Sequence, residues 1–306
     1  MYQQRRILKL CIGASIFLNI CYAQKNTATA YITSGDQIQL LQKQLLPLSQ
    51  TQSMNAINRI SIDTREKFQT IDGFGFTLTG GSALLIQQMP TKQRNALLQE
   101  LFGKTANAIS ISYLRISVGA SDLSESVFSY NDLAKGETDT LVQRFNLSRD
   151  TIHLVPLLKQ IVAINPSIKF MATPWSPPTW MKTNNNSMGG SLIPQYYRAY
   201  ARYLVKYIQA MSANGISIDA LTIQNEPQHG GNNPSMLMTA DEQGAFIKNH
   251  LGPLFAKHVI NTKIVVWDHN CDHPEFPISI LNDTAANRYI DGSAFHLYAG
   301  NISALS

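Results

Sequence analysis

The stretch Ala220-Leu-Thr-Ile-Gln-Asn-Glu-Pro227 joins a short apolar strand directly to an amide, a carboxyl group and a proline. Short runs of this kind, bounded by turn residues, are typical of strands buried in a core. Because proline disfavours helical geometry in the residue before it, we expect Glu226 to be extended at the strand tip. The pattern predicts that Asn225 and Glu226 project into a cleft; the alternative is an ordinary surface turn.

Comparable stretches recur along the chain and alternate with amphipathic helices. The expected strands, rich in β-branched or aromatic residues, are 68–77, 112–118, 168–174, 220–225, 263–268 and 292–298. The expected helices are 83–102, 150–164, 195–213 and 241–258. The third helix has one apolar side, formed by Tyr197, Tyr200, Leu204, Ile208 and Met211, and Asn214-Gly215 supplies its stop.

Alternation of strands and helices implies a parallel sheet with crossover helices, either open or closed into a barrel. Gly73-Phe74-Gly75 is a weak match to a dinucleotide-binding turn, which disfavours the open sheet. Polar and aromatic residues gather where successive strands end, as they do on the active face of barrels. The sequence therefore predicts an α/β fold, a (β/α)8 TIM barrel with about six of its eight units in residues 68–306. The preceding residues 24–67, including Ile60-Ser61-Ile62, are expected to add one or two short strands.

The composition of the 306 residues, 44% hydrophobic and 15% charged, is that of a globular protein with a substantial core. The formal charge is +5, and no lysine- or arginine-rich stripe is present, so nucleic acid is not an expected partner.

Residues 1–23 have the pattern of a secretory signal peptide. A basic start at Arg5-Arg6 precedes an apolar stretch, and Cys21-Tyr22-Ala23 offers small residues for cleavage. The stretch is too short for a stable membrane span. We expect export to the periplasm or the extracellular space, which leaves Cys271 as a single thiol, buried and inert.

Two further segments follow expected strands. Between Thr173 and Asn184 lies a stiff loop with three prolines, Trp175 and Trp180, whose flat indole faces suit the C–H faces of sugar rings or else plug the barrel rim. His296 and Tyr298 share one face of the last strand, where a packed core pair is the alternative.

Charged residues elsewhere suggest fewer functions. Arg115 lies in an apolar strand and should have an anionic partner, either structural or catalytic. The cluster Asp268-His269-Asn270-Cys271-Asp272-His273 follows no familiar zinc spacing, so we interpret it as a polar loop at the barrel rim and predict no metal site.

Five motifs, in this order along the chain, together resemble glycoside hydrolase family 30, the glucosylceramidase-like retaining β-glycosidases. They are Phe68-Gln-Thr-Ile-Asp-Gly-Phe-Gly75, Leu114-Arg-Ile-Ser-Val-Gly-Ala-Ser-Asp-Leu-Ser124, Trp175-Ser-Pro-Pro-Thr-Trp-Met-Lys-Thr-Asn184, Gln224-Asn-Glu-Pro227 and His296-Leu-Tyr298. The similarity runs from about Phe68 to the end.

The resemblance implies a barrel that hydrolyses β-glucosidic bonds in a carbohydrate or glycolipid without metal or organic cofactor. Glu226 would be the general acid/base and Asn225 the partner of the sugar 2-hydroxyl. Trp175, His296 and Tyr298 would line the subsite of the cleaved sugar. Gly80 stands where the glucosylceramidase branch carries an aspartate, so an endo-β-1,6-glucanase is the alternative activity.

The resemblance also implies a second carboxylate, a glutamate at the end of the seventh strand that acts as nucleophile. Six strand units are recognisable and the sequence ends at Ser306, so this glutamate is expected beyond the C-terminus. We therefore expect this chain to be inactive alone. The competing hypothesis is a non-catalytic carbohydrate-binding remnant.

Overall fold

The computed structural model describes residues 27–48, 60–105 and 108–305. The chain divides into two compact units, Met1–Gln69 and Thr70–Ser306. The proposed signal peptide lies outside the described residues and stays a prediction. Within the described ranges, no helix is long and apolar enough to cross a membrane.

The first unit contains an antiparallel pair of strands, β1 (Thr27–Ile32) and β2 (Gln42–Pro47), with Thr27 opposite Pro47. Short strands within residues 24–67 are thus confirmed, but they do not include Ile60-Ser61-Ile62. Ile60-Ser61-Ile62 has no regular structure, and the two isoleucines are 90% and 85% exposed. Alternation of apolar residues does not produce a strand without a partner to share hydrogen bonds.

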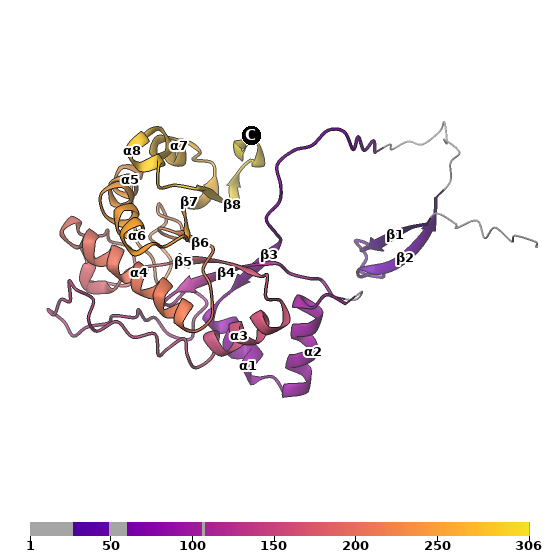
Figure 1. The fold of residues 1–306 in the computed structure, drawn as a ribbon, viewed down its shortest axis with the longest axis horizontal. Helices are drawn as coiled ribbons and strands as arrows, with labels where there is room; N and C mark the ends of the chain where they lie inside the picture. The colour runs from indigo at the N-terminus through magenta and orange to yellow at the C-terminus, as the bar shows by residue number, and fades with distance from the viewer. Residues whose placement is uncertain (1–26, 49–59, 106–107, 306) are drawn as a thin grey trace, which may run out of the picture. The chain divides into compact units, whose positions relative to one another are not determined.

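The second unit is built on a six-stranded parallel sheet whose strands follow one another in chain order (Figure 1). The strands are β3 (Gly75–Leu78), β4 (Tyr113–Val118), β5 (Lys169–Pro174), β6 (Ala220–Thr222), β7 (Lys263–Cys271) and β8 (Gly292–Gly300). All six strands were predicted, although β3 is only the end of the stretch 68–77. Sequential parallel pairing with intervening helices is the arrangement of a partial (β/α)8 barrel, as predicted.

Helices fill the connections between these strands. They are α1 (Gly80–Gln88), α2 (Thr91–Phe102), α3 (Leu154–Ile164), α4 (Tyr197–Ala213), α5 (Ala240–Phe246), α6 (Gly252–His258), α7 (Glu275–Asn282) and α8 (Thr284–Asn287). Single turns of 3-10 helix lie at Thr179–Met181, Pro194–Tyr196 and Ile302–Leu305, and a π-helical turn at Ile247–Leu251 joins α5 to α6. The short helices α7 and α8 were not predicted.

Prolines explain where two predicted helices differ from the structure. The expected helix 83–102 is two helices, because Pro90 forces the preceding Met89 into an extended conformation with ψ 146°. The expected helix 241–258 is continuous in course, but the π turn before Gly252 adjusts its hydrogen bonding next to Pro253.

Helix α4 forms as its periodicity predicts, and its buried residues share one hydrophobic core with those of the sheet. Its expected apolar face, Tyr197, Tyr200, Leu204, Ile208 and Met211, is buried throughout. Burying such a stripe is the main source of helix stability in a folded protein. Because parallel strands all end on the same edge, the residues that follow β4 to β8 are brought to one face of the barrel.

Candidate active site

The parallel sheet brings together three residues that follow its strands, Trp175, Asn225 and Glu226, and two that lie within strands, Arg115 and His296. All five were predicted from sequence to belong to one site. Asn225 and Glu226 follow β6, and the backbone N–H of Asn225 donates to the Pro174 carbonyl at 2.8 Å. This bond fixes the end of β6 to the end of β5. The predicted cluster is therefore one connected arrangement rather than scattered surface residues.

The buried carboxylate of Asp268 is the centre of this cluster. Its Oδ2 accepts hydrogen bonds from Arg115 Nη2 at 3.0 Å and from the Thr222 hydroxyl at 2.7 Å. Its Oδ1 lies 2.8 Å from Nε2 of His296. The Asp268 side chain is 1% exposed. Burial disfavours its charge, but the Arg115 guanidinium and His296 outweigh burial and hold the pKa of Asp268 well below its usual range.

His296 bridges this carboxylate to the candidate acid/base. Its Nδ1 lies 3.0 Å from Oε1 of Glu226, while its Nε2 faces Asp268. Both ring nitrogens must donate to satisfy two carboxylates, which requires the imidazolium form. Burial opposes that charge, but the two hydrogen bonds raise the pKa of His296 to about 9. The same His296 bond, against the opposing effect of burial, lowers the pKa of Glu226.

The backbone at Glu226 differs from the expected extended geometry. Its φ is +47°, in the left-handed region, so the prediction from the following proline was wrong. Proline disfavours the right-handed helical region, and the chain here has met that restriction by taking the left-handed one. Its N–H donates to the backbone carbonyl of Asp268 at 3.0 Å, which ties this turn to β7. Strained residues of this kind persist only where surrounding contacts hold them.

Arg115 has the anionic partner that its position in an apolar strand predicted, and it also orients two candidate site residues. Its Nη2 donates to Oδ1 of Asn225 at 2.7 Å. Its guanidinium lies over the ring of Trp175, 4.7 Å from the centroid. Trp175 is 4% exposed. Its indole is thus packed against the cation–carboxylate cluster, and stacking on a sugar stays a prediction.

The two remaining aromatic candidates have different surroundings. Trp180 is buried, and its indole N–H lies 3.0 Å from Oδ1 of Asn131, which matches the structural alternative for this loop. Tyr298 is 87% exposed, with its ring edge-on to His296 at a centroid separation of 6.2 Å. Tyr298 therefore borders the site without being held in it by packing.

The segment expected to be a polar loop after 268 is instead the end of β7. The strand continues to Cys271, and it contains a bulge between Trp267 and His269 at which Asp268 has no partner in β8. Trp267 and Asp268 both have positive φ, 73° and 64°. Bulges redirect side chains next to active sites, and this one accompanies the placement of Asp268 under His296.

Sequence reasoning missed three contributors to the site: Asp268, Thr222 and Asn232, whose amide donates to Oε2 of Glu226 at 3.2 Å. Asp268 ends its predicted strand just as the Asn225-Glu226 pair follows its own, and that position was the available signal. Nothing in the sequence pattern distinguished Asn232 in its loop. Among the described residues, no group of three or more His, Cys, Asp or Glu side chains could hold a metal ion.

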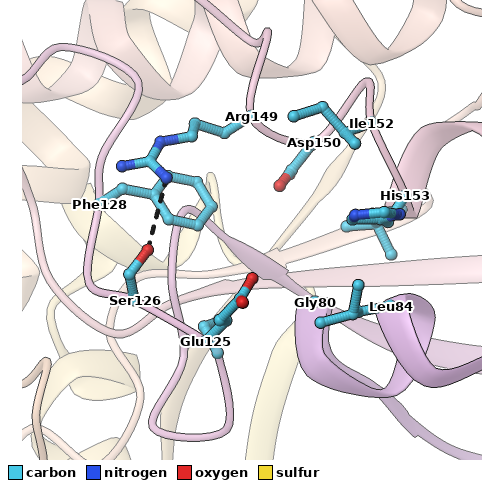
Figure 2. Close-up of a pocket in the computed structure, with 11 residues that line it drawn as sticks. Gly80, Leu84, Glu125, Ser126, Phe128, Arg149, Asp150, Ile152 and His153 are labelled. Atoms are coloured by element: carbon cyan, nitrogen blue, oxygen red, sulfur yellow. Dashed lines mark hydrogen bonds between the residues drawn. The ribbon is translucent and has the colours of Figure 1, made fainter.

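A separate cavity of about 120 Å³ lies between the start of α1, the loop after β4 and the start of α3 (Figure 2). Gly80, Glu125, Arg149, Asp150 and His153 are among its lining residues. Asp150 is 5% exposed and accepts a hydrogen bond from the Tyr130 hydroxyl. Burial, partly opposed by that bond, raises the pKa of Asp150 to about 7. The cavity is not lined by any of the candidate active-site residues Arg115, Trp175, Glu226, Asp268 and His296.

We expect Asp150→Asn to make the protein more stable relative to the wild type as pH rises. The folded protein keeps Asp150 protonated up to about pH 7, whereas the unfolded chain already ionises it near the ordinary pKa of 3.8. The wild type therefore loses stability as pH rises from about 4 to 7, and loses no more above that range. One pKa unit corresponds to about 1.4 kcal/mol, so the relative gain should be on the order of 2–4 kcal/mol. Urea unfolding of both proteins at pH 4 and at pH 7 measures this relative gain in stability. Exposed Asp122→Asn is the control; parallel pH curves for Asp150→Asn and wild type would contradict the prediction.

Comparison with known proteins supports the family suggested by the motifs. The glycosyl hydrolase family 30 TIM-barrel domain matches residues 71–304. An endo-1,6-beta-D-glucanase of Neurospora crassa is 35% identical over 283 residues, which are 89% of this chain and 58% of the relative. Putative glucosylceramidase 1 of Caenorhabditis elegans is 32% identical over 252 residues, 78% and 47% of the two chains. A solved endo-beta1,6-glucanase superposes with a TM-score of 0.81 at 36% identity, covering 90% of this chain and 62% of that one. The chain spans about half the length of the curated relatives it matches.

Proposed function

Because the chain belongs to glycosyl hydrolase family 30, we propose that it is the larger part of the barrel of a retaining enzyme that cleaves β-1,6-linked glucan. The names of its relatives support β-1,6-glucan at least as well as the glucosylceramide of the first hypothesis. The observation that carries the proposal is Glu226 at a strand end, beside Asn225 and hydrogen-bonded through both carboxylate oxygens.

In this mechanism Glu226 first protonates the glycosidic oxygen of the leaving group. It then acts as a carboxylate and removes a proton from the water that hydrolyses the glycosyl-enzyme. Asn225 is the partner of the 2-hydroxyl. Arg115 already donates to Oδ1 of Asn225, so the amide NH2 is the group left to donate to a sugar oxygen. Trp175, His296 and Tyr298 border the subsite of the cleaved sugar.

The reaction needs a second carboxylate at about 5–5.5 Å from the first. Asp268 is unsuited to this role, because it is 1% exposed and both its oxygens are engaged by Arg115, Thr222 and His296. We propose that a glutamate from a further barrel strand supplies the nucleophile. Its charge would raise the pKa of Glu226 and so return the acid to the protonated state that the first step requires.

We expect a polypeptide extended by two further strand–helix units to cleave β-1,6-glucan faster than β-1,3-glucan or glucosylceramide, with retention of configuration. Reducing-end release measures the rates, and proton NMR of the first-formed anomer reports the stereochemistry. The 306-residue chain should bind β-1,6-glucan oligosaccharides in calorimetry without cleaving them. Faster hydrolysis of glucosylceramide would reassign the substrate, and normal turnover by the 306-residue chain would refute the external nucleophile. Binding by both chains with hydrolysis by neither would indicate a carbohydrate-binding protein.

A further inference from the structure

The second oxygen of Glu226 is held by a loop rather than by the barrel. We propose that Asn232 is a positioning residue that serves both protonation states of Glu226, and that buried Lys182 holds its loop in place. This inference rests on the proposed acid/base role of Glu226. The loop in question, here called the Asn232 loop, comprises residues 227–238 between β6 and α5.

The two partners of Glu226 are held to different degrees. His296 contacts Oε1 and is fixed at its other nitrogen by Asp268, with distances of 3.0 Å and 2.8 Å. Asn232 contacts Oε2 through its Nδ2 at 3.2 Å, from a loop without helix or extended strand. The contact that can change during turnover is therefore the one to Asn232.

An amide suits a partner that changes its protonation state. Its NH2 donates to Oε2 while Glu226 is a carboxylate, as in the structure. After a half-turn about its terminal torsion, its carbonyl oxygen accepts the hydrogen of a protonated Oε2. The proton that Glu226 passes to the leaving oxygen, and later takes back from water, then resides on Oε2. A carboxylate or an ammonium at position 232 offers only one of these two roles.

The Asn232 loop is joined to the loop that follows β5 by a set of backbone contacts. Ser235 N–H donates to the Ser187 carbonyl at 2.9 Å, and Leu237 N–H donates to the Gly190 carbonyl at 2.8 Å. The Ser187 hydroxyl donates to Oδ1 of Asn233, next to Asn232, at 2.7 Å. These bonds fix the course of the backbone that follows Asn232.

Lys182 links the two loops through its buried amine. Its side chain is fully buried, and its Nζ donates to the carbonyls of Ser235 at 2.6 Å and Ser187 at 3.0 Å, one in each loop. Its hydrogen bonds are to carbonyls rather than to a carboxylate, and burial lowers the pKa of Lys182 to about 7. An amine kept in such a place at an electrostatic cost is a strong constraint on the two loops that it joins.

The pKa of Glu226, followed by carbon-13 carboxyl NMR in the 306-residue chain, tests the role of Asn232 without any turnover. Asn232→Ala should shift this pKa upward, because the charge-assisted bond to the carboxylate that is lost is stronger than the neutral bond to the protonated form that is lost with it. Asn232→Asp should shift it further upward, because a like charge is added. Asn261→Ala, at an exposed site before β7, should leave it unchanged. An unchanged pKa in both Asn232 variants would overturn the proposal.

The role of Lys182 in holding the Asn232 loop is tested by combining variants. As a single substitution, Lys182→Met should raise the pKa of Glu226. In the Asn232→Ala background it should cause no further rise, since Lys182 acts through Asn232. Should Lys182→Met fail to fold, Ser187→Ala loosens the same pair of loops through the Asn233 contact. Additive shifts would overturn the role of Lys182. If the variants shift the pKa of Glu226 as expected but the extended chain does not hydrolyse glucan, the proposed function is refuted while the positioning role of Asn232 stands.

Discussion

Glu226→Gln should lower the kcat of β-1,6-glucan hydrolysis by about 10²–10⁴-fold in the extended polypeptide, the range that general acid–base catalysis contributes. Glutamine preserves the size of the side chain and can keep hydrogen bonds to His296 and Asn232, whose contacts are 3.0 Å and 3.2 Å long. It carries no transferable carboxyl proton. The loss therefore reports chemistry rather than collapse of the site.

The leaving group provides the matched control for this variant. An aryl β-glucoside with a strongly acidic phenol needs little protonation, so Glu226→Gln should lose much less activity in the first step with that substrate. A burst of phenol followed by slow turnover is the expected time course, because the second step still lacks its base. Equal losses on glucan and on the aryl glucoside would contradict the assignment of Glu226 as the acid.

Asp268→Ala should reduce the free energy of unfolding by about 3–5 kcal/mol, the usual cost of removing one partner from a buried ion pair. The variant leaves the Arg115 guanidinium, 15% exposed, and the His296 ring without their shared carboxylate. Urea unfolding at pH 7 measures the loss. Asp72→Ala removes the exposed carboxylate that pairs with Lys169, and it should change stability little. Similar results for the two variants would contradict the central role of Asp268.

The pH dependence of stability provides a second readout for the same variant. The pKa of His296 is raised from 6.5 to about 9 in the folded protein, so its stabilising contribution is fully present below about pH 6.5 and is lost as pH rises through about 9. Asp268→Ala removes the first of the two hydrogen bonds that raise this pKa. The decline of stability over that pH window should therefore be smaller in the variant than in the wild type.

Hydrophobic periodicity and turn-forming residues were sufficient to predict all six parallel strands and the buried face of α4. Strand position and helix face both follow from local rules of burial. The same local rules failed where a long-range contact decided the conformation. Ile60-Ser61-Ile62 alternates like a strand but has no partner strand in the part of the chain that the structure describes. The left-handed φ of Glu226 accompanies a bond to the Asp268 carbonyl. Pro90 was a readable break that the expected helix 83–102 overlooked.

The site was predictable as far as residue type and strand position reveal it. Asn225 and Glu226 follow a strand, Arg115 and His296 lie within one, and the structure brings all four together. Asp268 reaches the cluster at a bulge whose two left-handed residues have no sequence signature. Asn232 contacts Glu226 from a loop whose course depends on buried Lys182. Contacts of this kind are formed by the folded chain and are not encoded in any local pattern.

The sequential order of the sheet shapes how the chain acquires its structure. Each strand from β4 to β8 pairs with the strand that precedes it along the chain. During synthesis, every strand therefore emerges next to a partner already made, and the growing edge can serve as the template for the next addition. Assembly by this route is vectorial, from the amino-terminal strands onward. The Arg115–Asp268–His296 cluster, which draws on β4, β7 and β8, can form only after β8 has been synthesised, although Glu226 itself follows β6.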